Sequence, residues 1–177
     1  KNNVGTFKLS DSIVTTGAQV GYDQMNGVLP GCSEFSGWVT LKVKINMPRY
    51  VVQKSARLAG EGADKWRESV NAKIGDTVEW RIEVRNTGST TLNSINVIDE
   101  LPPYMTAEAG TVKLINGTNP STNPYVYGAG AIQQQNGKTY VNVDAGNYAP
   151  NSNGFVRFSS KIVSDPAILC DNQKLTN

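Results

Sequence analysis

The stretch Gly75–Pro103, GDTVEWRIEVRNTGSTTLNSINVIDELPP, decides the fold of this chain. From Val78 to Val84 apolar and charged residues alternate strictly. A period of two is typical of a strand with one face on a core and the other in water. Asn86-Thr87-Gly88 supplies turn chemistry, and a second alternating run follows over Leu92–Ile98. The stretch therefore predicts two consecutive strands joined by a turn.

The same alternation recurs along the chain and predicts an all-β protein. Asn136-Gly137 is a strong type I′ hairpin signal between two short apolar runs. Strands at this spacing, separated by short turns, favour an antiparallel immunoglobulin-like β-sandwich, here with an additional short N-terminal β segment. We expect residues 1–47 to form that segment, either as the tail of a preceding domain or as an element that donates a strand to a neighbouring copy. Residues 48–177 should form the sandwich domain. The further predicted strands are Gly5–Leu9, Ile13–Thr15, Trp38–Ile45, Tyr50–Leu58, Thr111–Ile115, Ala131–Gln135, Thr139–Val143 and Phe155–Val163.

Composition excludes several functional classes. A net charge of +2 in 177 residues, without a stripe of basic and aromatic residues, argues against nucleic-acid binding. No apolar run is long enough for a membrane span. With no histidine and two cysteines, most metal sites and the common nucleophilic triads and dyads are absent. We therefore expect a non-enzymatic protein without cofactor or metal. The chain does not begin with methionine, and we expect it to be a piece of a longer protein.

The two cysteines, Cys32 and Cys170, lie near opposite ends of the chain. In a secreted β protein they could form one disulfide; two buried free thiols are the alternative. Asp23, Asn26 and Glu34 share one loop and could ligate calcium, but their spacing matches no known calcium loop, so a solvated turn is the better interpretation.

The run AKIGDTVEWRIEVRNTGSTTLNSINVIDELPPYM resembles the conserved repeat domain of bacterial cell-surface proteins, the eleventh in the series of domains of unknown function. Its features are Gly-Asp-Thr-Val before an alternating strand, an Asn-Thr-Gly turn, and a second strand ending in Asp-x-Leu-Pro. Gly110–Asn116, Asn147–Phe158 and Leu175–Asn177 resemble later segments of that domain, so the similarity covers about residues 50 to 177. The domain's last strand normally continues beyond the position of Asn177.

The resemblance implies an immunoglobulin-like module of an extracellular bacterial surface protein, serving as a stalk spacer or a filament subunit. Its partners would then be other copies or neighbouring domains of the same surface protein. The alternative is an adhesin domain that binds a cell-surface ligand through the loops at 23–37 and 118–130. The similarity implies no enzymatic activity, and the fold alone does not decide among the other roles.

Strand parity places two charged residues on apolar faces, Lys54 on the first strand of the sandwich domain and Asp99 on a central one. One interpretation is a buried or strand-end ion pair, or else strand ends at which each side chain reaches water by itself. The other is an intramolecular isopeptide bond, since adhesins of similar fold join a first-strand lysine to a last-strand asparagine beside a buried acid. Lys54 would then be the nucleophile, Asp99 the acid that promotes the reaction, and Asn177 the amide. Asn86 is a second candidate amide, although an Asx turn explains it better.

Overall fold

The computed structural model describes residues 10–18 and 40–163, and the chain divides into two compact units, Lys1–Lys44 and Ile45–Asn177. Within the first unit, a 3₁₀ helix, η1, spans Asp11–Val14. The predicted strand Ile13–Thr15 is therefore wrong. Ser10 caps the helix by accepting a hydrogen bond from the Ser12 N–H at 3.3 Å, and this local bond closes a tight turn in place of an extended strand.

The predicted strand Trp38–Ile45 is also wrong where it can be compared, because residues 40–45 belong to no strand. Leu41, Val43 and Ile45 are 56%, 81% and 75% exposed. Alternation gives a segment one apolar side, but a strand also needs a neighbouring edge to pair with, and no described strand pairs with this segment. The predicted strand Gly5–Leu9 lies outside the described residues.

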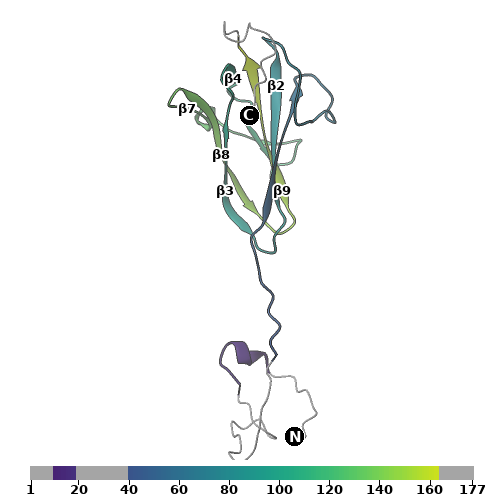
Figure 1. Cartoon of the computed structure of the whole chain (residues 1–177), viewed down its shortest axis with the longest axis vertical. Coiled ribbons are helices and arrows are strands. Elements are labelled where there is room, and N and C mark those ends of the chain that lie inside the picture. Colours follow the sequence, from purple (N-terminus) through teal and green to yellow (C-terminus); the bar gives the residue numbers. More distant parts are fainter. Residues whose placement is uncertain (1–9, 19–39, 164–177) are drawn as a thin grey trace, which may run out of the picture. The chain divides into compact units, whose positions relative to one another are not determined.

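The second unit is an antiparallel β-sandwich, as the sequence predicts (Figure 1). A six-stranded sheet, here called the larger sheet, has the order β1-β2-β9-β5-β6, with β4 also paired to β9. The smaller sheet has three strands in the order β3-β8-β7. The strands are β1 (Tyr50–Leu58), β2 (Thr77–Asn86), β3 (Leu92–Glu100), β4 (Met105–Ala107), β5 (Lys113–Ile115), β6 (Tyr125–Val126), β7 (Ile132–Gln135), β8 (Lys138–Tyr148) and β9 (Asn153–Ile162), and a 3₁₀ helix, η2 (Ala129–Ala131), precedes β7.

The core lies between the inner faces of the two sheets. In the larger sheet, Val78, Ile82 and Val84 of β2 are buried, whereas the intervening Glu79, Arg81 and Arg85 face outward. β9 buries Val156, Phe158, Ser160 and Ile162 in the same way, and β8 of the smaller sheet buries Val141, Val143 and Ala145. The predicted alternation of β2 and β9 is thus confirmed, whereas in β1 the burial does not alternate: Val51 and Val52 are both exposed, and Ser55 and Ala56 are both buried.

Local signals in the sequence also place the turns. Asn136 and Gly137 both have positive φ, 52° and 76°, as a type I′ hairpin requires, and they join β7 to β8. β3 is irregular near Ser94, whose φ is 52° and where the register with β8 shifts. The bulge turns the strand without changing which side Val97 and Asp99 face. The strands β4 and β6, of three and two residues, are too short for a periodic pattern, and the sequence does not predict them.

Candidate functional site

Lys54 and Asp99 join the two sheets. Lys54 lies on the inner face of β1, opposite Ile82 of β2, and Asp99 lies on the inner face of β3 in the smaller sheet. The Nζ of Lys54 donates hydrogen bonds to both carboxylate oxygens of Asp99, at 2.7 and 2.8 Å. The two residues that hydrophobic patterning could not explain therefore form an ion pair with each other.

The pair is shielded from water by the sandwich. The side chains of Lys54 and Asp99 are 21% and 11% exposed, and the Lys54 Nζ lies 4.5 Å from the centre of the Trp80 ring. Desolvation lowers the pKa of Lys54, although the hydrogen bond and charge of Asp99 oppose the shift. A lysine in this setting releases its proton more easily than one in water, so its neutral amine, the nucleophilic form, is more accessible.

Asn86 serves a structural purpose. Its side chain is fully buried, and its Nδ2 donates to the carbonyl oxygens of Thr90 and Tyr148, each at 2.8 Å. Its Oδ1 accepts from the N–H of Gly88 at 2.9 Å, which forms the expected Asx turn. Because these bonds engage both ends of the carboxamide, Asn86 holds the β2–β3 turn against the end of β8.

The remaining predicted site residues lie outside the described residues: Asn177, Cys32, Cys170 and the loop carrying Asp23, Asn26 and Glu34. No described carboxamide forms a hydrogen bond with Lys54, so an isopeptide with Asn177 stays a prediction. Across residues 10–18 and 40–163 there is no cluster of acidic or cysteine residues that could hold a metal ion. Within the same ranges, no helix is long and apolar enough to cross a membrane.

The outer edge of β3, here called the open edge, has no partner strand among residues 10–18 and 40–163. In the part of the chain that the structure describes, β3 pairs with β8 on one side and with no strand on the other. The Leu101 N–H donates to the Thr139 carbonyl at 2.8 Å, and antiparallel ladders bond at alternate residues. Val97 and Asp99 therefore bond toward β8, while the backbone groups of Asn96, Ile98 and Glu100 point to the open edge.

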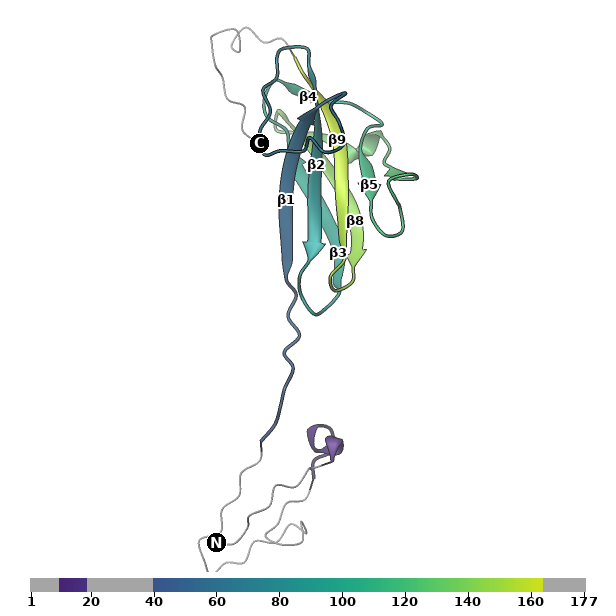
Figure 2. The ribbon, with the colours of Figure 1, turned by 90° about the vertical axis from the view of Figure 1, so that its right-hand side faces the viewer.

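The inner face of β1 is uncovered beside this edge. Val52 and Val84 are paired across β1 and β2 on the same inner face, yet Val84 is 3% exposed and Val52 is 54% exposed. The smaller sheet ends at β3, whose Asp99 reaches Lys54 of β1, so it does not extend over the first residues of β1 (Figure 2). Tyr50, two residues before Val52 in β1, is 65% exposed.

A segment that pairs with no described strand, residues 40–46, precedes β1 in the sequence. Apolar and polar side chains alternate along residues 40–45, and all of them are exposed. The apolar residues are Leu41, Val43 and Ile45, and the polar ones are Thr40, Lys42 and Lys44. The segment is followed by an anchored connection: the Met47 N–H donates to Ser89 Oγ and the Ser89 N–H donates to the Met47 carbonyl, each at 3.2 Å. The alternation in the sequence predicted the apolar side of this segment. The open edge of β3 can be recognised only from the strand order, and no sequence signal predicted the contact of Trp80 with Lys54.

Comparison with known proteins gives no relative. No protein-family model matches the chain, and searches of curated proteins and of solved structures found no match. The resemblance to the bacterial surface repeat domain therefore stays a prediction.

Proposed function

We propose that this chain is a non-enzymatic structural subunit of an extracellular bacterial surface assembly, in which residues 40–46 of one copy add a strand to the open edge of β3 in the next. The observation that carries the proposal is the open edge beside the uncovered inner face of β1. Exposed edges of this kind pair readily with another chain. The extracellular bacterial setting rests on the resemblance of residues 50–177 to a surface repeat domain.

The segment 40–46 has the pattern that the vacant position requires. A strand beside β3 needs apolar side chains on its inner side and polar ones on its outer side. Leu41, Val43 and Ile45 would meet the first requirement, with Lys42 and Lys44 facing water. The added strand would also cover Val52 and bring the Lys54–Asp99 pair further from water.

The energetics favour assembly at high local concentration. Burying three aliphatic side chains yields roughly 5–8 kcal/mol, and covering Val52 and Tyr50 adds to this. The loss of translational and rotational freedom costs about 4–15 kcal/mol. A single strand therefore gives a weak junction in dilute solution, and repeated junctions along a filament or stalk would strengthen it by multivalency.

Light scattering of the full chain, over a series of protein concentrations, tests the proposal. We expect the mean mass to rise with concentration, and Val43→Asp to abolish the rise, because a carboxylate would be forced onto the inner side of the added strand. Lys42→Gln is the matched control on the outer side and should assemble as the wild type does. A wild type that stays monomeric at all concentrations, or a Val43→Asp variant that assembles normally, would contradict strand addition.

A stalk spacer and a filament subunit differ in the products that form. Electron micrographs of concentrated protein should contain linear chains of subunits if the isolated chain polymerises by itself. Discrete dimers that do not lengthen would favour a spacer whose neighbour is supplied by the rest of a longer protein.

A further inference from the structure

A row of three cations crosses the outer face of the larger sheet. Arg81 of β2 pairs directly with Arg157 of β9, and Arg157 pairs with Lys113 of β5. Like charges directly opposite each other on neighbouring strands destabilise a sheet. The row therefore costs stability unless something on this face compensates for it.

The nearby carboxylates do not neutralise this row. Glu79 forms its ion pair with Arg57, and Glu83 accepts hydrogen bonds from Arg85 and Asn153. Among the described residues, no carboxylate forms an ion pair with any of the three cations of the row. The Nε of Arg157 is buried and has no hydrogen-bond partner in the same ranges. The row thus retains positive charge and at least one unused donor.

Trp66 holds the guanidinium groups in place. It lies in the loop after β1, where the backbones of Ala56 and Arg67 exchange two hydrogen bonds of 2.8 and 3.0 Å. The carbon centres of three guanidinium groups lie 4.6, 4.7 and 5.2 Å from the Trp66 ring, those of Arg57, Arg81 and Arg157. Cation–π contacts fix the planes of these groups but leave their N–H edges able to bind a ligand.

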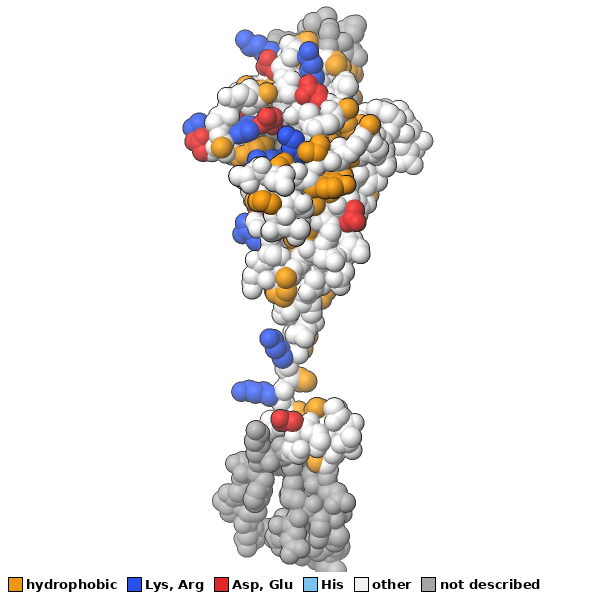
Figure 3. Space-filling model, turned by 180° about the vertical axis from the view of Figure 1, so that it is seen from behind, with side chains coloured by type: hydrophobic (Ala, Val, Ile, Leu, Met, Phe, Trp, Pro, Cys, Tyr) orange, Lys and Arg blue, Asp and Glu red, His pale blue; other side chains and the backbone are white. Residues whose placement is uncertain are grey.

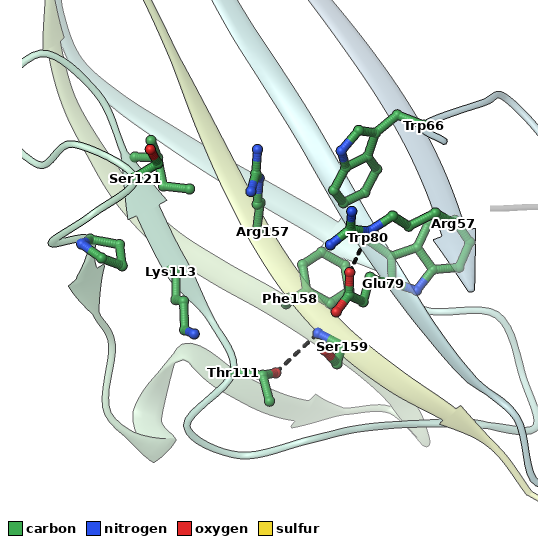
Figure 4. Close-up of a pocket in the computed structure, with 12 residues that line it drawn as sticks. Arg57, Trp66, Glu79, Trp80, Thr111, Lys113, Ser121, Arg157, Phe158 and Ser159 are labelled. Atoms are coloured by element: carbon green, nitrogen blue, oxygen red, sulfur yellow. Dashed lines mark hydrogen bonds and ion pairs between the residues drawn. The ribbon is translucent and has the colours of Figure 1, made fainter. Parts of the chain in front are cut away.

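Two members of the row, Arg157 and Lys113, line a pocket of about 240 Å³, which Glu79, paired with Arg57, also lines. Figure 4 shows Arg157 and Lys113 on its floor, Trp66 on one side and Ser121 on the other. Pro124 adds an apolar surface, and the loop that carries Ser121 and Pro124 is part of the 118–130 loop expected to bind ligand in an adhesin. On the face seen in Figure 3, basic side chains lie among apolar ones over the upper half of the sandwich.

We propose that this pocket binds an acidic sugar unit of a polysaccharide, with the sugar carboxylate held by Arg157 and Lys113. A guanidinium fork and an ammonium match a carboxylate, and a planar fork can bind it with two parallel hydrogen bonds. The Ser121 hydroxyl can bond to sugar hydroxyls, and the ring can lie against Pro124. The pocket is smaller than the ~300–1,000 Å³ of sites for larger ligands, which suits a single sugar ring.

A bound carboxylate would also relieve a local electrostatic cost. Desolvation, followed by the charges of Arg81 and Arg57, lowers the pKa of Arg157, since burial and like charges both disfavour its protonated form. A bound carboxylate would act in the same direction as the charge of Glu79 and offset the repulsion from Arg81 and Arg57, although not the effect of burial. This site requires neither the open edge of β3 nor any second copy of the chain.

Titration calorimetry of the full chain with trigalacturonate, and with maltotriose as the neutral control, tests the site. We expect binding of the acidic trisaccharide, no binding of maltotriose, and at least a tenfold loss of affinity in Arg157→Gln. Arg85→Gln is the matched control. Arg85 also lies on the outer face of the larger sheet, but it forms an ion pair with Glu83 and does not line the pocket. Arg157→Gln should fold well, since it removes a like charge from the row.

Two further titrants show whether a simple anion or an acidic peptide binds as tightly as the acidic trisaccharide. Sulfate alone should bind at least tenfold more weakly than trigalacturonate, and so should a short oligoglutamate peptide. Equal binding of sulfate would mean an adventitious ion only, and tighter binding of the peptide would assign the pocket to a protein partner; either result overturns the proposal. It is also overturned if trigalacturonate fails to bind, or binds Arg157→Gln as it binds the wild type.

Discussion

Replacing Asp99 by leucine should destabilise the sandwich strongly, because Lys54 would keep its charge and lose its partner. Removing one member of a buried ion pair costs about 3–5 kcal/mol. The Lys54 side chain is 21% exposed and lies 4.5 Å from the Trp80 ring, so part of this cost is offset. We expect a loss of about 2 kcal/mol, which lowers the Tm of a domain of this size by about 6–10 °C.

The double variant Lys54→Met with Asp99→Leu separates the contribution of the ion pair to stability from that of side-chain packing. Replacing both charges by apolar side chains of similar volume is often neutral or stabilising, so its Tm should return to within about 4 °C of the wild type. Differential scanning calorimetry and urea unfolding of all four species give the coupling energy.

Glu100 and Lys138 provide the matched control. Their ion pair is as short as that of Lys54 and Asp99, 2.7 Å, but the two side chains are 43% and 55% exposed. Glu100→Gln should leave the Tm almost unchanged, because water solvates both charges. The burial argument would be refuted if Asp99→Leu behaved like Glu100→Gln, or if the double variant were as unstable as the sum of the single ones.

The remaining predictions concern covalent chemistry, pH and backbone packing. If Lys54 and Asn177 form an isopeptide bond, the intact mass of the protein will be lower than the mass calculated from the sequence by one ammonia. An unchanged mass would exclude the bond. Mass spectra recorded with and without reductant also show whether the two cysteines form a disulfide. Burial raises the pKa of Glu83, but hydrogen bonds from Asn153 and Arg85 outweigh it and lower the pKa below 4.5. The ionised Glu83 therefore stabilises the fold at pH values above its pKa in the unfolded state, and this stabilisation is lost as the pH falls through its pKa in the folded state. In Glu83→Gln the free energy of unfolding, measured with urea, should fall less steeply at acid pH. An unchanged pH dependence would contradict this. A methyl group at Gly88 would lie 2.4 Å from the Met47 carbonyl oxygen. Gly88→Ala should therefore displace the chain before β1 and speed hydrogen exchange of the Ser89 amide. Unchanged protection of this amide would show that the chain before β1 accommodates the methyl group without losing the bond.

The sequence predicted the faces of the long strands because burial repeats every second residue along them. That pattern sufficed to place Lys54 and Asp99 on inner faces, and two opposite charges on the inner faces of a sandwich made their contact a reasonable expectation. The same pattern failed for residues 40–45, where alternation exists but no strand among the described residues pairs with the segment.

Features that depend on strand order were out of reach of the sequence. The row formed by Arg81, Arg157 and Lys113 arises only because β2, β9 and β5 are neighbours, although they are far apart in the chain. The open edge of β3 follows from the same order. Trp66 is distant in sequence from two of the three guanidinium groups that it contacts, so no local spacing reveals their stacking.

Mixing two defective variants tests strand addition most directly. Val43→Asp lacks a competent added strand but keeps an intact β3 edge. Ile98→Pro removes a backbone N–H that points to the open edge, while the bonds of β3 to β8 remain. We expect each variant alone to be monomeric by light scattering, and their mixture to form dimers that do not lengthen, because only one junction per pair can form. If the mixture stays monomeric, or if Ile98→Pro alone assembles as the wild type does, residues 40–46 do not bind at the edge of β3.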